Sequence, residues 1–265
     1  MSARLPARRP TTRRLRASSG ASSTESWERL CLAKRKLDLA VREEDYPTAA
    51  AAKAEVDLLL ERLPSSKVVL SGLLSKLGEV GDSSERQATI QQLGKLGDAA
   101  AVPSLAGCLH DADPSTAEAA EEALWACFMR CPSPELELDM QRGVALMQAD
   151  QLEQALAVFD GIIAQAPSFA EGYNKRATCL YLMQRYHAAI LDCRVTLELQ
   201  PYHFGAASGM GMCCGYVNDT RGALAAFKQA VAINGRQKPY LMSHIAALQR
   251  QQQREEEQRG RQSNE

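Results

Sequence analysis

The feature of this sequence that most constrains its fold is a period of 34 residues between Leu136 and Gln237. Four sets of residues keep this step: Gly143, Ala177 and Gly211; Ala155, Ala189 and Ala223; Phe159, Cys193 and Phe227; and Pro167, Pro201 and Gly235. A fixed period of this length is typical of stacked helix pairs, in which small residues let neighbouring helices approach closely. The composition agrees, because 45% of the residues are hydrophobic and only 5% are aromatic. We therefore expect an all-α chain.

The period, the small residues and the Pro before each new pair resemble the tetratricopeptide repeat. This resemblance implies three repeats over residues 136–237, followed by a capping helix over 239–254. In that helix Leu241, Ile245 and Leu248 are expected to cover the last exposed face of the array. The Gln/Arg/Glu-rich segment 255–265 has no apolar stripe, and we expect it to be disordered.

By analogy with this family, the first helix of each repeat lines a concave groove. The expected peptide-groove residues are Met140, Val144, Met147, Asn174, Lys175, Thr178, Tyr181, Met212 and Tyr216. Most of them are neutral, and flexible Met with amphipathic Tyr suits an apolar or helical peptide. The alternative is that several of these side chains pack against Ala-rich neighbours instead.

Members of this family that grip the acidic C-termini of heat-shock chaperones use a two-carboxylate clamp of Lys, Asn and Arg. The corresponding places here hold Met140, Val144, Lys175, Gly205 and Gly209. Since only one of them is basic, we expect no binding of such a tail, although Lys175 and its neighbour Asn174 could hold one polar group.

Glycines are dense in the first helix of the third repeat, at Gly205, Gly209, Gly211 and Gly215. Three of them exceed what the repeat requires, and each costs about 0.5–1 kcal/mol of helix stability relative to Ala. We expect this helix to be either the most mobile or the most closely approached part of the array. The sequence leaves open whether a ligand side chain or a neighbouring helix fills the space.

Residues 27–63 have the pattern of a helical hairpin that resembles the UVR motif. The resemblance rests on Val41, Glu44, Asp45, Tyr46, Ala49, Ala50, Lys53 and Glu55, together with Ala40 and Val56. It departs from the family at Lys53, where Arg is usual, and at Ala54, where Asp is frequent. The motif occurs in bacterial and plastid adaptors of Clp-type chaperones, so the resemblance implies such a partner. A hairpin this short buries itself poorly, and self-association is the other expectation. A generic amphipathic hairpin stays an alternative.

Between residues 65 and 131, Gly-Asp turns separate short Ala/Leu-rich helices. Gly97 and Asp98 should end one helix and start another, and Asp113 with Pro114 should begin the next. The segment resembles HEAT repeats of the short, phycobilisome-lyase-like type, with one and a half to two repeats visible. We favour the reading that these helices cap and extend the following array over the reading that they form a second partner groove.

The first 24 residues contain six arginines and no acid, with many Ser and Thr. This composition resembles an organelle transit peptide, although a disordered basic tail is the alternative. We expect a chloroplast location, with the mitochondrion or the cytoplasm as alternatives. The rest of the chain carries a formal charge of −7, which argues against a nucleic-acid partner. No apolar run is long enough for membrane insertion.

Residues that carry chemistry form no persuasive set. The four histidines are dispersed, no nucleophile or phosphate-loop motif is present, and the eight cysteines lack a CxxC spacing. Most cysteines are expected to be small buried hydrophobes, and a redox switch between Cys127 and Cys131 is a minor alternative. We expect no catalytic site, metal or cofactor. The sequence therefore predicts a non-enzymatic adaptor or scaffold. The alternative is an assembly factor or regulatory subunit for a photosynthetic or other organelle complex, and DNA repair is less favoured.

Overall fold

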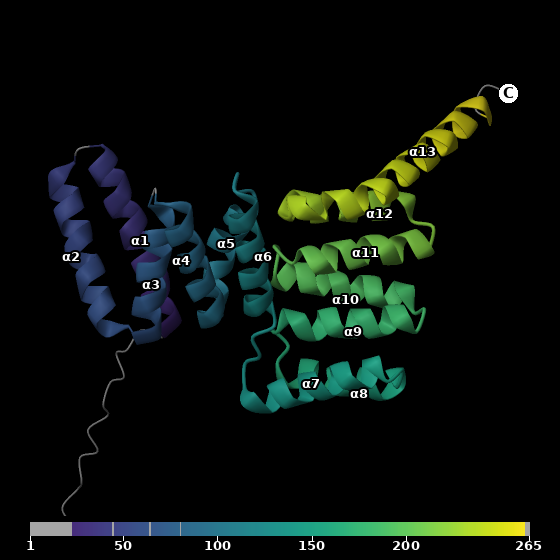
Figure 1. Cartoon of the computed structure of the whole chain (residues 1–265), viewed down its shortest axis with the longest axis horizontal. Helices are drawn as coiled ribbons and strands as arrows, with labels where there is room; N and C mark the ends of the chain where they lie inside the picture. Colours follow the sequence, from purple (N-terminus) through teal and green to yellow (C-terminus); the bar gives the residue numbers. More distant parts are fainter. Residues whose placement is uncertain (1–22, 44, 64, 80, 263–265) are drawn as a thin grey trace, which may run out of the picture. The chain divides into compact units, whose positions relative to one another are not determined.

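The computed structural model describes residues 23–43, 45–63, 65–79 and 81–262, and this part of the chain contains helices and no strand (Figure 1). The helices are α1 (Ser23–Arg42), α2 (Tyr46–Arg62), α3 (Ser65–Gly78), α4 (Ser83–Leu96), α5 (Val102–Cys108), α6 (Pro114–Phe128), α7 (Pro134–Gln148), α8 (Leu152–Gln165), α9 (Ala170–Leu182), α10 (Tyr186–Leu199), α11 (Phe204–Tyr216), α12 (Thr220–Ile233) and α13 (Lys238–Gln262). Two short 3₁₀ turns, η1 (Ala99–Ala101) and η2 (Gly235–Gln237), join them. The all-α prediction is confirmed. The chain divides into two compact units after Val68.

The first unit is an antiparallel hairpin of α1 and α2. Its core contains Leu30, Ala33, Val56 and Leu59, all buried. Asp45 caps α2 by accepting a 3.2 Å hydrogen bond from the Thr48 amide, and Pro47 occupies the first turn, where its missing N–H costs nothing. The described residues between 27 and 63 thus form a helical hairpin, as the sequence pattern indicates.

In the second unit, α4 packs against α6 at a point of close contact. A Cβ added to Gly94 would lie 2.8 Å from the Cα of Ala123, so only Gly allows this crossing. At the end of α4, Gly97 adopts a left-handed conformation with φ of 62°, and the guanidinium of Arg130 donates to the carbonyls of Lys95 and Leu96.

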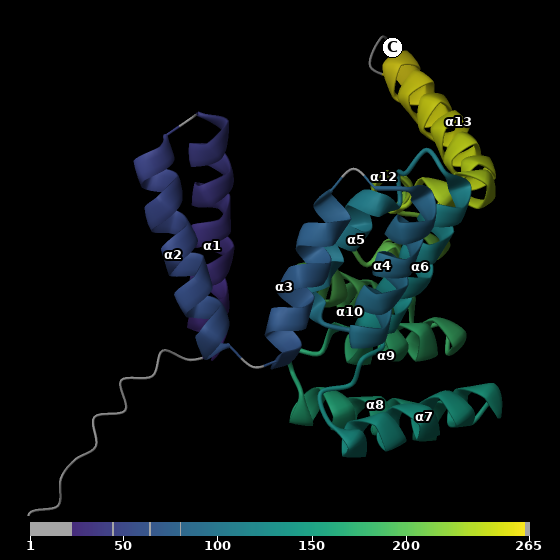
Figure 2. The ribbon, with the colours of Figure 1, turned by 60° about the vertical axis from the view of Figure 1, so that its left-hand side comes forward.

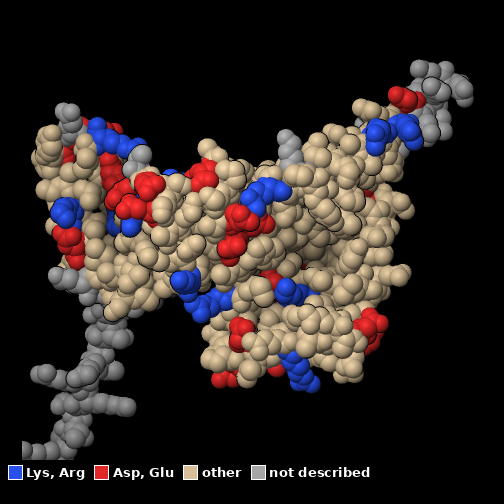
Figure 3. Space-filling view, viewed as in Figure 1, with Lys and Arg blue, Asp and Glu red and all other residues tan. Residues whose placement is uncertain are grey.

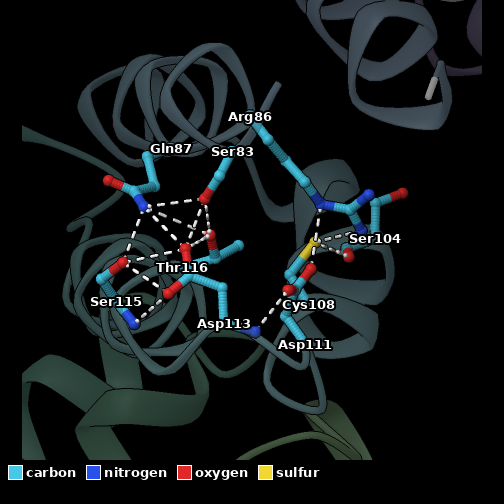
Figure 4. A network of polar contacts seen from close by, with 9 residues as sticks. All are labelled: Ser83, Arg86, Gln87, Ser104, Cys108, Asp111, Asp113, Ser115 and Thr116. Atoms are coloured by element: carbon cyan, nitrogen blue, oxygen red, sulfur yellow. Dashed lines mark hydrogen bonds and ion pairs between the residues drawn. The ribbon is translucent and has the colours of Figure 1, made fainter. Parts of the chain in front are cut away.

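The N-terminal ends of α4 and α6 are joined by a polar network centred on Asp113 (Figure 4). This residue caps α6 by accepting from the Ser115 amide at 3.1 Å, as predicted, and it also accepts from Ser83, Gln87 and Thr116. The donors on Ser83, Ser115 and Thr116 hold the pKa of Asp113 well below its ordinary value, with the Ser83 hydroxyl as the largest cause. The carboxylate therefore fixes the register of the two helices.

Helices α7–α12 form three successive antiparallel pairs that stack side by side (Figures 1 and 2). Within each pair the turn contains a residue with positive φ, at Asp150, Gln184 and Asn218, which again stand 34 residues apart. The pairs α7–α8, α9–α10 and α11–α12 fall inside the predicted repeats, so the period has the structural meaning that the sequence indicates.

The helix crossings inside the pairs show matched side-chain volumes. In the first and third pairs a Cβ on Gly143 or Gly211 would lie 2.6 or 2.5 Å from the ring of Phe159 or Phe227. In the second pair the same two places hold Ala177 and Cys193, both buried. A larger residue on the first helix thus accompanies a smaller one on the second, as close packing requires.

Helix α6 lies across the end of the stack at which α11 begins (Figure 1). The Trp125 ring approaches Gly205, where a Cβ would be only 2.7 Å away, and it meets Phe204 edge-on. Nearby, Arg236 of η2 bonds to Glu121 at 2.9 Å and to the carbonyl of Pro114. The predicted close approach to the third repeat is therefore made, at Gly205, by a helix of the same chain.

Residues 65–131 do not cap the array as expected. Their helix α6 contacts the ends of later helices, while Arg142 and Ala157 on the outer face of the first pair stay exposed. The reason is that the aromatic side chains of α6 pack against His203 and Gly205 rather than against α7 and α8.

At the other end, α13 covers the last pair with Leu241 and Ile245, both buried against Phe227 and its neighbours. This helix runs to Gln262, so the expectation of disorder from residue 255 is wrong over 255–262. Gln, Arg and Glu are good helix formers, and a helix that is already nucleated can continue without an apolar stripe. Residues 263–265 lie outside the described part, as do residues 1–22 of the expected transit peptide, whose last two positions begin α1. None of the described helices is long and apolar enough to cross a membrane.

Candidate ligand groove of the helical array

A half-open cavity of about 260 Å³ lies between α9, α11 and the start of α13. Its lining is mostly neutral and consists of Asn174, Ala177, Thr178, Tyr181, Cys193, Gly205, Gly209, Met212, Cys213 and Tyr240. The array carries few charged residues over most of the face shown in Figure 3. The site can therefore hold an apolar group with little electrostatic selectivity.

Helical spacing explains why these side chains share one site. Asn174, Thr178 and Tyr181 follow each other by four and three residues along α9, so they lie on one face. Gly209 and Met212 repeat this arrangement on α11. A Cβ on Gly209 would meet only the Cys193 sulfur, at 4.0 Å, so this glycine leaves open space above the helix backbone.

A second hollow of about 300 Å³ continues along α11 towards α13. It is lined by Gly211, Met212, Gly215, Tyr216, Phe227, His244, Ala247 and Leu248. Met212 lines both hollows, and we call the two together the α11 trough.

Three tyrosines stand at the end of the α11 trough. Tyr216 stacks on Tyr186 with 4.5 Å between ring centroids and 6° between planes, and Tyr181 meets both rings edge-on at 5.7 Å. A hydrogen bond with Tyr216, followed by desolvation, raises the pKa of Tyr181 to about 12. Tyr181 is therefore neutral at physiological pH, and the three residues offer ring faces and hydroxyl groups to a ligand.

A buried polar network lies beneath the first turns of α9 and α11. The Nδ1 of His203 accepts from the Ala206 amide at 3.0 Å and so caps α11, which leaves Nε2 to donate to Glu171 at 2.9 Å. Lys175 and Asn174 also bond to the Glu171 carboxylate. Burial raises the pKa of Glu171, but the bonds with His203 and Lys175 outweigh it, and the net pKa is lowered.

This network changes the reading of two predicted groove residues. The amide of Asn174 donates to Glu171 while its side chain lines the cavity, and the ammonium of Lys175 is 3.1 Å from the same carboxylate. Both side chains therefore have a donor engaged by the buried Glu171 carboxylate. That this pair also holds one polar group of a ligand stays a prediction.

The other predicted groove residues divide between the repeats. Thr178, Tyr181, Met212 and Tyr216 line the α11 trough. Val144 and Met147 of the first pair are half-buried and do not line it. The prediction that Met140 lines the groove is wrong. Its side chain is only 3% exposed and packs with Phe159 and Ile162, because α7 turns it into the core of the first pair.

Several lining residues escaped the sequence reading. Tyr240 belongs to the capping helix, whose expected role was only to cover the last face, and Ala177, Cys193 and Cys213 were interpreted as packing residues. The 34-residue period could have indicated Tyr240, since the start of α13 continues that period. Gly205 and Gly209 had been singled out, and the structure shows a neighbouring helix filling the first and open space beside the second.

The predicted hairpin residues lie around the α1–α2 turn and along α2. Ala49 is buried and Asp45 caps α2, whereas Ala50 is exposed, as is Tyr46 at 73%. Lys53 pairs with Asp57, and Glu55 pairs with Arg29 at 3.1 Å. Val41 is 59% exposed, whereas its neighbour Ala40 is buried. Glu44 lies outside the described residues.

All eight cysteines are free thiols, and the four in the repeat helices are buried as expected. Burial raises the pKa of Cys127 to about 11 and that of Cys131 to about 12. The described residues hold no group of three or more His, Cys, Asp or Glu side chains suited to a metal ion.

The fold is an all-α array of helix pairs that repeat every 34 residues, and its sequence is similar to that of tetratricopeptide-repeat proteins. A TPR repeat-containing protein of Rhizobium etli is 36% identical over 78 residues, which are 29% of this chain and 38% of that protein. The Hsp70-Hsp90 organizing protein of Triticum aestivum is 30% identical over 93 residues, which are 35% of this chain and 16% of that protein. The chain thus spans well under half the length of these relatives.

Among solved structures, the Sgt2 TPR domain from Aspergillus fumigatus is similar to this chain, with 18% identity and a TM-score of 0.45. The similarity covers 48% of this chain and 85% of that domain. No family model matches the chain.

Proposed function

We propose that this protein is a non-enzymatic adaptor whose α11 trough holds an apolar or helical peptide segment of another protein. The observation that supports this proposal is the cavity beside Gly209. It is open and apolar, and the described residues that line it include no free cation. Large apolar side chains of a ligand gain most from entering such a space, since each removes apolar surface from water.

The chemistry of the trough argues against an acidic peptide. The wheat relative is named for Hsp70 and Hsp90, yet the five places of a carboxylate clamp hold no free base here. Lys175 is committed to the buried Glu171, and Met140 is in the core. A ligand carboxylate would lose its hydration without gaining a partner, which is costly.

Filling the open space tests this proposal. Gly209→Leu adds a side chain in the cavity, whereas Gly107→Leu makes the same change on α5, where nothing lies within 4 Å of an added Cβ. Fluorescence anisotropy would compare labelled amphipathic Leu/Phe peptides with acidic peptides that end in two carboxylates. We expect the apolar peptides to bind better, and Gly209→Leu alone to weaken them by tenfold or more. Preferential binding of the acidic peptides, or no effect of Gly209→Leu, would contradict the proposal.

The hairpin is proposed as the second docking element of the adaptor. Leu32 and Leu39 are 68% and 54% exposed and stand seven residues apart, on the face of α1 away from its core, and Leu58 of α2 is also exposed. The resemblance to UVR motifs supports a Clp-type chaperone as the partner here. Two docking elements on one chain would raise the effective concentration of their partners towards each other.

The competing function is an assembly factor for an organelle complex, with a hairpin that only dimerises. A double variant Leu32→Glu and Leu39→Glu separates the two functions. Loss of binding to a purified Clp-type chaperone, with no change in oligomeric state, would support the adaptor; loss of dimerisation alone would support the assembly factor. A chloroplast location is part of the proposal, and a fluorescent fusion of the full chain would test it against the mitochondrion and the cytoplasm.

A further inference from the structure

Repeat symmetry shows how one helix pair receives the next. In the second pair, the Arg176 guanidinium makes two 2.7 Å bonds to Asp192 of its own pair and one of 2.7 Å to Asp160 of the preceding pair. These bonds join the first and second pairs at their shared face. All three are charge-assisted hydrogen bonds, and the two to Asp192 form a bidentate pair. Such bonds are stronger than hydrogen bonds between neutral groups.

Arg142 occupies the same place one repeat earlier, and there both partners are missing. Val158 stands where the second pair has Asp192, and the outer face of α7 and α8 is not covered by a helix pair. Arg142 is exposed and has no ion-pair or hydrogen-bond partner among the described residues. The first pair thus presents a receiving face with an unused cation.

This receiving face, the outer face of α7 and α8, has a hollow lined by one acidic and one basic side chain. A hollow of about 370 Å³ is lined by Asp139, Arg142, Gln154, Ala157, Val158 and Gly161. Asp139 precedes Arg142 by three residues, so the acid and the base lie side by side on α7, above a floor of small apolar residues from α8. Leu138, on the same helix, is 66% exposed.

We propose that this face binds the same face of a second copy of the chain, with Arg142 of each copy paired to Asp139 of the other. An acid and a base side by side on one helix are self-complementary about a two-fold axis, which is the condition for a closed dimer. Stacking of one array on the far end of another is blocked, because α13 already covers that end with Leu241 and Ile245. The two free first pairs are therefore left to meet each other.

Charge reversal on the full chain tests this dimer. Sedimentation velocity over a concentration series would compare the natural chain with Arg142→Glu, Asp139→Arg, the double reversal, and Lys228→Glu, which reverses an exposed charge on α12. We expect a dimer for the natural chain and for Lys228→Glu. Each single reversal should weaken dimerisation by tenfold or more, because like charges then face each other, and the double reversal should restore it.

Unaltered circular dichroism and melting temperature would show that each variant is folded, as the exposure of Arg142 predicts. High salt should weaken the natural dimer, since the pairs lie at the surface. A monomer at every concentration would overturn the proposal. So would a dimer that is indifferent to all four variants, which would place the interface elsewhere, or a double reversal that fails to restore association.

Discussion

The Nε2 of His203 donates a 2.9 Å hydrogen bond to Glu171, thirty-two residues earlier, and both side chains are completely buried. The bond ties the N-terminal end of α11 to that of α9, while Phe128 of α6 stacks on the imidazole with 4.5 Å between centroids. Three segments that are distant in sequence therefore meet at one polar pair. Its integrity controls the position of α6 and of both helices that line the trough.

Glu171→Gln is predicted to destabilise the chain by about 1–3 kcal/mol at about pH 7, because Lys175 loses its charged partner while a hydrogen bond to His203 can persist. The folded-state pKa of Glu171 is lowered, so its stabilisation is fully present above the unfolded value of 4.5 and is lost as the pH falls through the folded-state pKa. Urea unfolding at about pH 7 and about pH 3 should show the difference between the two chains shrinking in acid. An equal difference at both pH values would contradict this assignment.

Phe128→Ala is predicted to loosen α6 from the array. Phe128 is 5% exposed and its ring covers His203, so its removal should cost about 3–5 kcal/mol. Met129→Ala is the matched control, since Met129 is 43% exposed and should change stability by less than about 0.5 kcal/mol. Hydrogen exchange at the Ala206 amide, which bonds to His203, should accelerate only in the first variant. Equal effects of the two substitutions would show that α6 is not held through this ring.

Local patterns in the sequence were sufficient to predict most of the helices and where they begin and end. The 34-residue step places the three pairs, and Asp113 with Pro114 begins α6 where expected. These features depend on propensity, capping and spacing, which act over a few residues. The extension of α13 to Gln262 was missed because the apolar stripe was given more weight than helix propensity.

The site was predictable only in part, because its shape depends on contacts between distant segments. The family analogy predicted Thr178, Tyr181 and Met212 as groove residues, and all three line the trough; that the trough binds a peptide stays a prediction. The sequence gives no sign that Trp125 occupies the space at Gly205 while Gly209 stays open, or that Glu171 holds Lys175. Met140 was misplaced because an analogy fixes the position along a helix better than its rotation towards the core.

Gly211→Ala is predicted to destabilise the third pair by about 1–3 kcal/mol through overpacking, since the added Cβ would lie 2.5 Å from the Phe227 ring. The second pair supplies the compensating change, because Ala177 faces Cys193 there. The double variant Gly211→Ala with Phe227→Cys should therefore be more stable than the sum of the two single effects indicates. A double-mutant cycle by urea unfolding measures this coupling, and additive effects would contradict the matched-volume argument.

Cys127 and Cys131 are predicted to be unreactive in the folded chain, although they stand four residues apart. Burial raises the pKa of Cys127 to about 11 and that of Cys131 to about 12, so the thiolate that reacts with alkylating agents or disulfides is scarce at about pH 8. Iodoacetamide labelling read by mass spectrometry should modify both residues slowly in the native chain and fully in concentrated urea. The native rate should rise as the pH approaches the raised pKa values. A disulfide between the two cysteines after mild oxidation of the folded chain would instead show that the end of α6 opens readily, and it would make this pair a redox switch.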